Sequence, residues 1–182
     1  MAAPDRTGSE RPADSRWSAD GLEFLYESLY VAAIGGSVVA LFFLAVDAVR
    51  GDPLFTPSLM GTVLFTHVAA DAVRTVDLGM VAAYTPVHFG SFALLGLAVA
   101  LIAREAELHS RHPVAIMAGG FLLLEVGFVA AATLGMPGVV ARIGYGWVAA
   151  ANGLAAMAIA IFLTSAHRPA VWNRLKHSAH LR

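Results

Sequence analysis

The sequence of 182 residues is strongly apolar and almost neutral: 58% of its residues are hydrophobic, 14% are charged, and the formal net charge is −1. Soluble proteins carry about 25% charged residues, so this composition, with a mean hydropathy of +0.68, predicts an integral membrane protein. The charge balance gives no reason to expect nucleic acid as a partner. The chain has no cysteine, which excludes disulfides, thiolate nucleophiles and iron–sulfur clusters.

Both ends of the sequence differ from the apolar middle. Residues 1–21 are rich in Ala, Pro, Asp, Ser and Arg and lack the apolar stretch of a secretory signal, so they are expected to form a disordered cytoplasmic tail. Residues 22–168 are expected to form one domain of membrane helices. Residues 169–182 combine Trp172 with basic and apolar residues, which is typical of a cytoplasmic tail at the membrane interface.

Four apolar stretches are long enough to cross a membrane, which takes about 20 residues of helix. They cover residues 29–49, 80–103, 114–136 and 145–166. Small residues recur at a spacing of four in three of these stretches, which predicts close contacts between helices. These residues are Ala32, Gly36 and Ala40, then Gly127 and Ala131, then Ala149 and Gly153.

A fifth apolar stretch, residues 57–73, is shorter and contains His67 and Asp71. Thr56 followed by a proline predicts that a short helix begins there. His67, Asp71 and Arg74 recur at i, i+4 and i+7, which predicts a polar face on a helix that lies in the interface or re-enters the membrane. This stretch could instead be a fifth span.

The distribution of basic residues distinguishes between these two topologies, because Lys and Arg accumulate in cytoplasmic loops. If residues 57–73 do not span, nine basic residues lie on one side and three on the other; if they do span, the division is seven against five. The first division is the more asymmetric. The predicted fold class is therefore all-α, a membrane four-helix bundle with a short outer helix and with both termini in the cytoplasm.

Ionisable residues at membrane depth are costly and are candidates for function. Glu125 lies at the centre of the third span and His88 lies in the second. Because the two spans are antiparallel, these residues lie at similar depths and could face each other. Asn152 in the fourth span and Asp47 near the outer end of the first point to the same polar cluster, which His67 of the short helix could close.

Three hypotheses account for this cluster. Glu125 could be a neutral acid, kept protonated by desolvation, that joins helices by a hydrogen bond to His88 or Asn152. The cluster could bind a transition metal through His88, Glu125 and either His67 or Asp47. Alternatively, Glu125 and His88 could exchange a proton, as acid and histidine chains do in pumps.

Several of these residues form a pattern that resembles one found in a group of known proteins. Asp47, residues 51–57 (Gly-Asp-Pro-Leu-Phe-Thr-Pro), Tyr84-Thr85, His88-Phe89 and Glu125 resemble a group of small uncharacterised bacterial four-span membrane proteins. The resemblance covers about residues 34–129. It implies an inner-membrane location and singles out His88 and Glu125, and it supplies no reaction.

The sequence thus favours a small multi-pass protein of the inner membrane with a buried polar site, acting as an accessory or ion- or proton-handling component. A metal-dependent membrane enzyme and a purely structural subunit of a larger membrane complex are the alternatives. The lipid bilayer is the expected partner, together with other membrane subunits in the last case. The sequence contains no Gly-rich phosphate loop, no Gly-x-Ser-x-Gly elbow and no His-Glu-x-x-His pair, which are motifs that would indicate an enzyme.

Overall fold

The computed structural model describes residues 14–109 and 113–166, which fold into helices joined by short loops. In chain order the elements are α1 (Asp14–Val49), α2 (Phe55–Thr66), the single 3-10 turn η1 (Ala70–Ala72), α3 (Leu78–His109), α4 (Pro113–Gly135), α5 (Val139–Ile143) and α6 (Tyr145–Ala166).

Four of these helices contain a segment long and apolar enough to cross a membrane. The segments are Ser28–Val49 in α1, Leu78–Ala98 in α3, Ala118–Gly135 in α4 and Tyr145–Phe162 in α6. The predicted all-α four-helix bundle is therefore confirmed, and the chain is a multi-pass membrane protein. Each predicted span lies within one of these helices to within one residue, because a continuous apolar run in lipid must be helical to satisfy its backbone groups.

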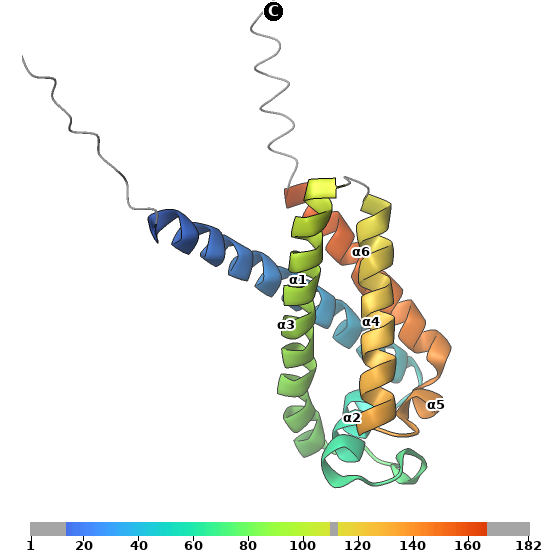
Figure 1. Cartoon of the computed structure of the whole chain (residues 1–182). Helices are drawn as coiled ribbons and strands as arrows, with labels where there is room; N and C mark the ends of the chain where they lie inside the picture. The colour runs from blue at the N-terminus through green and yellow to red at the C-terminus, as the bar shows by residue number, and fades with distance from the viewer. Residues whose placement is uncertain (1–13, 110–112, 167–182) are drawn as a thin grey trace, which may run out of the picture.

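The spanning helices are packed unequally. α1 packs along α3 and α6, and α6 packs along α4, whereas α3 and α4 make few contacts with each other. Figure 1 shows α3 and α4 side by side, with α1 and α6 crossing behind them. The elements α2, η1 and α5 gather at one end of the bundle, which we call the short-helix end (Figure 1).

The short-helix end differs from the sequence-based prediction in two respects. α2 ends at Thr66, because His67 adopts a left-handed conformation (φ 56°) and its N–H closes the helix on the carbonyl of Val63. His67, Asp71 and Arg74 therefore do not share one helical face. The short helix α5 was not predicted; it is separated from α4 by Pro137 and by Gly138, whose φ is +82°.

The predicted tails fall largely beyond the described residues. Residues 1–13 and the C-terminal segment 169–182 lie outside them, so those predictions stay untested. Residues 14–21, which were expected to belong to the tail, form the beginning of α1.

The contact between α1 and α3 is close because glycines lie in it. A Cβ atom built on Gly96 of α3 would overlap the carbonyl oxygen of Ser28 on α1, and one built on Gly36 would lie 3.1 Å from the ring of Phe89. The small-residue prediction is thus met at Gly36. It fails at Gly127, where nothing lies within 4 Å of an added Cβ, because α4 faces a cavity there rather than a helix.

This packing predicts opposite effects of one added methyl group at two glycines of α3. Gly96→Ala should destabilise the bundle by about 1–3 kcal/mol, the cost of overpacking, because the backbone of α1 must move away. Gly90→Ala is the matched control, since nothing lies within 4 Å of its added Cβ and alanine favours the helix. Thermal unfolding in detergent micelles measures both; equal stability of the two variants would contradict the close contact.

Candidate functional site

Glu125 is the buried acid at the centre of α4, and its polar partner comes from α6. Asn152 donates a hydrogen bond from Nδ2 to Oε2 of Glu125 over 2.7 Å, and both residues are buried. The other oxygen, Oε1, has no hydrogen-bond partner among the described residues. Of the partners that the sequence suggested, the structure therefore supplies Asn152 and leaves half of the carboxyl group unused.

Tyr145, the first residue of α6, interacts with the same carboxyl group. Its side chain is 55% exposed, and it lies at the short-helix end of α6 (Figure 1). Tyr145 is therefore a largely exposed residue close to the buried carboxyl group of Glu125.

His88 lies on α3 at the depth that the sequence predicted. It follows the start of α3 by ten residues, and Glu125 precedes the end of α4 by ten residues, which places each about 15 Å from the short-helix end. His88 Nε2 lies 3.0 Å from the backbone oxygen of Gly36 on α1. Because a carbonyl oxygen only accepts, Nε2 carries the proton. His88 and Glu125 thus bond to different helices and not to each other.

A cavity of about 710 Å³ lies within the bundle, beside the sparsely packed faces of α3 and α4. Its walls are mainly apolar, and its volume is within the range of small-molecule sites. The walls include Met60, Phe92, Leu124 and Phe128. His88 and Asn152 both line it, so the cavity is the space that the two halves of the predicted site share.

Asp47 does not belong to this site, contrary to expectation. Its carboxyl group accepts two hydrogen bonds from Thr56, one from the backbone N–H over 2.6 Å and one from the hydroxyl over 2.8 Å. Thr56 lies in the first turn of α2, where N–H groups lack partners within the helix. Asp47, near the end of α1, therefore caps α2. Thr56 was predicted to begin the helix, but the N-cap position is Leu54, which forms no side-chain cap.

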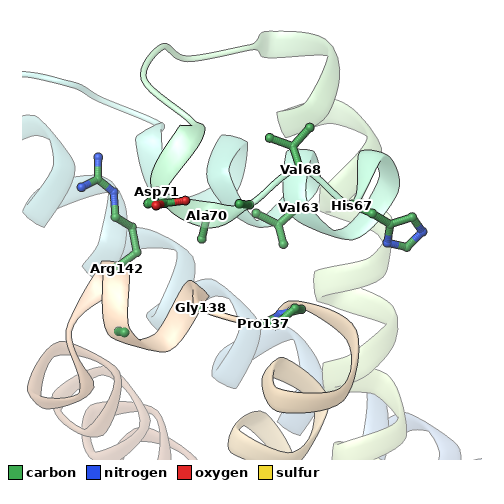
Figure 2. A pocket seen from close by; sticks show the side chains of 10 residues that line it. Val63, His67, Val68, Ala70, Asp71, Pro137, Gly138 and Arg142 are labelled. Carbon is green, nitrogen blue, oxygen red and sulfur yellow. The ribbon is translucent and has the colours of Figure 1, made fainter.

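His67 does not close the site either. Its side chain is exposed, and it lines a different cavity, of about 630 Å³, between the end of α2, η1 and α5. Figure 2 shows its ring on the opposite side of that cavity from Asp71 and Arg142. α2 ends at His67, which adopts a left-handed conformation, and His67 and His88 line different cavities.

The described residues do not assemble the metal site that the sequence suggested. No group of three or more His, Cys, Asp or Glu side chains in residues 14–109 and 113–166 is arranged to hold a metal ion. The reason is that Asp47 is used by α2, His67 lies on another cavity, and His88 and Glu125 bond to other partners.

Tyr84 is a residue of the site that the sequence analysis did not single out. It lies four residues before His88 on the same face of α3, its ring centroid is 6.0 Å from that of His88, and it lines the large cavity. The i, i+4 spacing of Tyr84 and His88 was the signal that could have revealed it. No protein-family model, curated protein or solved structure matches this chain.

The role of Asp47 leads to a prediction about stability. Asp47→Ala should destabilise the protein by about 1–3 kcal/mol, because the N–H and hydroxyl of Thr56 are left buried without acceptors. Thr56→Val is the matched control: it removes the hydroxyl bond and keeps the N–H bond, so its effect should be smaller. Thermal unfolding of both variants in micelles measures the difference. An Asp47→Ala variant as stable as the wild type would show that the cap is dispensable.

Proposed function

We propose that this protein is a proton-handling component of the bacterial inner membrane, in which Glu125 is the group that takes up and releases the proton. The observation that carries the proposal is the carboxyl group of Glu125, which is buried at the centre of a spanning helix with Oε1 unpartnered among the described residues. A carboxylate in such surroundings is costly unless it is paired, whereas the neutral acid is tolerated.

The neighbours of Glu125 support this role. Tyr145 lies near the carboxyl group and is half-exposed at the short-helix end, which supports a proton path between Glu125 and the surface. Asn152 holds the carboxyl group and also lines the large cavity. The proposed relay therefore involves Glu125, Tyr145 and the cavity.

The orientation in the membrane is part of the same proposal. With four spans, both ends of the bundle domain lie on one side. The basic residues at the short-helix end are Arg50, Arg74 and Arg142, and the other nine belong to the opposite side. The positive-inside rule then places both termini in the cytoplasm and the short-helix end outside it, so Tyr145 would exchange protons with the periplasm.

Reporter fusions test this orientation. A reporter joined after Asp77, between η1 and α3, should report the periplasm, and one joined after Arg182 should report the cytoplasm, because nine basic residues hold their side inside. A fusion after Arg111 provides the control for the α3–α4 connection and should agree with Arg182. A cytoplasmic signal after Asp77 combined with a periplasmic signal after Arg182 would exclude the proposed topology.

Infrared spectroscopy of the purified protein in lipid tests the role of Glu125. The wild type should show a carboxylic-acid C=O band that is absent in Glu125→Gln and that changes reversibly with pH, because the proposed role requires this group to bind and release a proton. Glu125→Gln should keep near-normal thermal stability, since the amide still accepts the hydrogen bond from Asn152. Asp52→Asn, at an exposed acid of the short-helix end, is the control and should leave the band unchanged.

Two outcomes separate the proposal from a purely structural role. A Glu125 band that does not change with pH would show an acid that only joins α4 to α6. The absence of any Glu125 band would show that the group is ionised throughout, and either result would overturn the proton-handling role.

A further inference from the structure

The large cavity beside α3 and α4 offers a site that is independent of the proton held by Glu125. Its walls come from α1, α2, α3 and α4, with single residues from α5 and α6, and it is partly open rather than enclosed. α3 and α4 are both spanning helices and make few contacts with each other. Because both helices span the membrane, an entrance between them would face the hydrocarbon, and a molecule dissolved in the bilayer could enter sideways.

Two polar atoms of α3 residues that line this cavity, the Tyr84 hydroxyl and His88 Nδ1, have no hydrogen-bond partner among residues 14–109 and 113–166. Tyr84 is 9% exposed, lines the cavity, and its hydroxyl forms no hydrogen bond with any described residue. His88 uses Nε2 to donate to the carbonyl of Gly36, so in the neutral ring Nδ1 is an acceptor. The other hydroxyls of α3 at the cavity are already used: Thr85 and Ser91 donate to the backbone of their own helix.

The remaining pair thus consists of one hydroxyl that can donate and one nitrogen that can accept. Because Tyr84 and His88 lie one turn apart with ring centroids 6.0 Å apart, one small polar headgroup can reach both. Neither group is charged, and the aromatic rings of Phe92 and Phe128 line the same cavity. The site therefore suits a flat, neutral ring that carries oxygen atoms.

Depth narrows the class of ligand further. Tyr84 and His88 follow the start of α3 by six and ten residues, so they lie about 9 and 15 Å along the helix. A phospholipid keeps its charged headgroup at the interface, because a charge at this depth is costly. A quinone or quinol is neutral, so its ring can enter the hydrocarbon region together with its apolar tail.

We propose that the cavity between α3 and α4 binds a membrane quinone or quinol, with the ring held by Tyr84 and His88 and the isoprenoid tail leaving between the two helices. The Tyr84 hydroxyl donates to a carbonyl oxygen of the quinone, and His88 Nδ1 accepts from a hydroxyl of the quinol. Tyr84 thus donates to the ring of either form, His88 accepts only from the quinol, and apolar contacts with Met60, Leu124 and Phe128 contribute most of the affinity.

A glycine in the wall provides the test. No atom lies within 4 Å of a Cβ built on Gly127, and Gly127 lines the cavity. Gly127→Leu should therefore fold normally and place its side chain where the ligand binds. Gly119→Leu is the matched control: it lies on the same helix, an added Cβ there also meets nothing within 4 Å, and it does not line the cavity. Tyr84→Phe removes only the hydroxyl.

The full chain of each variant is purified in mild detergent and titrated with decylubiquinone and with its reduced form, and bound quinone and phospholipid are quantified in an organic extract. Wild type and Gly119→Leu should bind about one quinone per chain. Gly127→Leu should lose binding, and Tyr84→Phe should raise the Kd for the quinone about fivefold, the effect of one neutral hydrogen bond. If the thermal unfolding of Tyr84→Phe equals that of the wild type, the change in its Kd reflects a lost contact with the quinone and not a loss of stability.

Three results would overturn the proposal. They are equal quinone binding by wild type and Gly127→Leu, an unchanged Kd for Tyr84→Phe, and an extract in which phospholipid fills the wild-type cavity and decylubiquinone does not displace it. None of these results depends on the protonation of Glu125, so the quinone site and the proton-handling role can fail separately.

Discussion

The close contact between α1 and α3 determines how the rest of the bundle is arranged. Gly96 allows the backbone of α3 to approach the Ser28 carbonyl of α1, and Gly36 receives the ring of Phe89. In lipid, such contacts replace the hydrophobic effect as the source of helix association. Because α3 is drawn onto α1, and α4 is held by α6 instead, the faces of α3 and α4 that would otherwise meet are left apart. The large cavity follows from this division of partners.

The same contact determines the chemistry available at the cavity. The Gly36 carbonyl lies within reach of His88 only because α1 and α3 are close, and its acceptor character places the proton on Nε2. On the other wall, the α4–α6 pair brings Asn152 to Glu125. Each polar group of the predicted site is thus assigned its partner by the helix against which its own helix packs. This explains why His88 and Glu125 lie at one depth without sharing a hydrogen bond.

The sequence predicted the spans well and the site only in part. A continuous apolar run in lipid must form a helix, so the number of spans and most of their limits could be predicted from composition. Depth could also be counted, which is why His88, Glu125 and Asn152 were found near one level. The rotation of each helix about its axis could not be predicted, because the spanning segments have no strongly polar face that would orient them.

Asp47 and His67 illustrate a different limit. Both were assigned to the site because their expected depth in the membrane is close to that of the site. Their roles are instead determined by local backbone geometry. The turn after α1 returns Thr56 to Asp47, and a left-handed residue at His67 ends α2 early. No pattern of apolar residues in the sequence predicts either of these backbone features. Polar residues in short connections therefore need the structure before they can be assigned.

The position of α2 has a consequence for how solutes reach the interior. Met60 and Leu64 of α2, with Met136 and Ile143, line the large cavity from the short-helix end, so water-soluble molecules arriving from that side meet an apolar barrier. A molecule that enters from the bilayer, as proposed above, would not cross this barrier. The concentration that governs occupancy is then the one within the membrane phase, and the apparent affinity of any compound, expressed per volume of water, rises with its tendency to partition into lipid. The bundle would thus select first by solubility in the bilayer and only afterwards by hydrogen bonding.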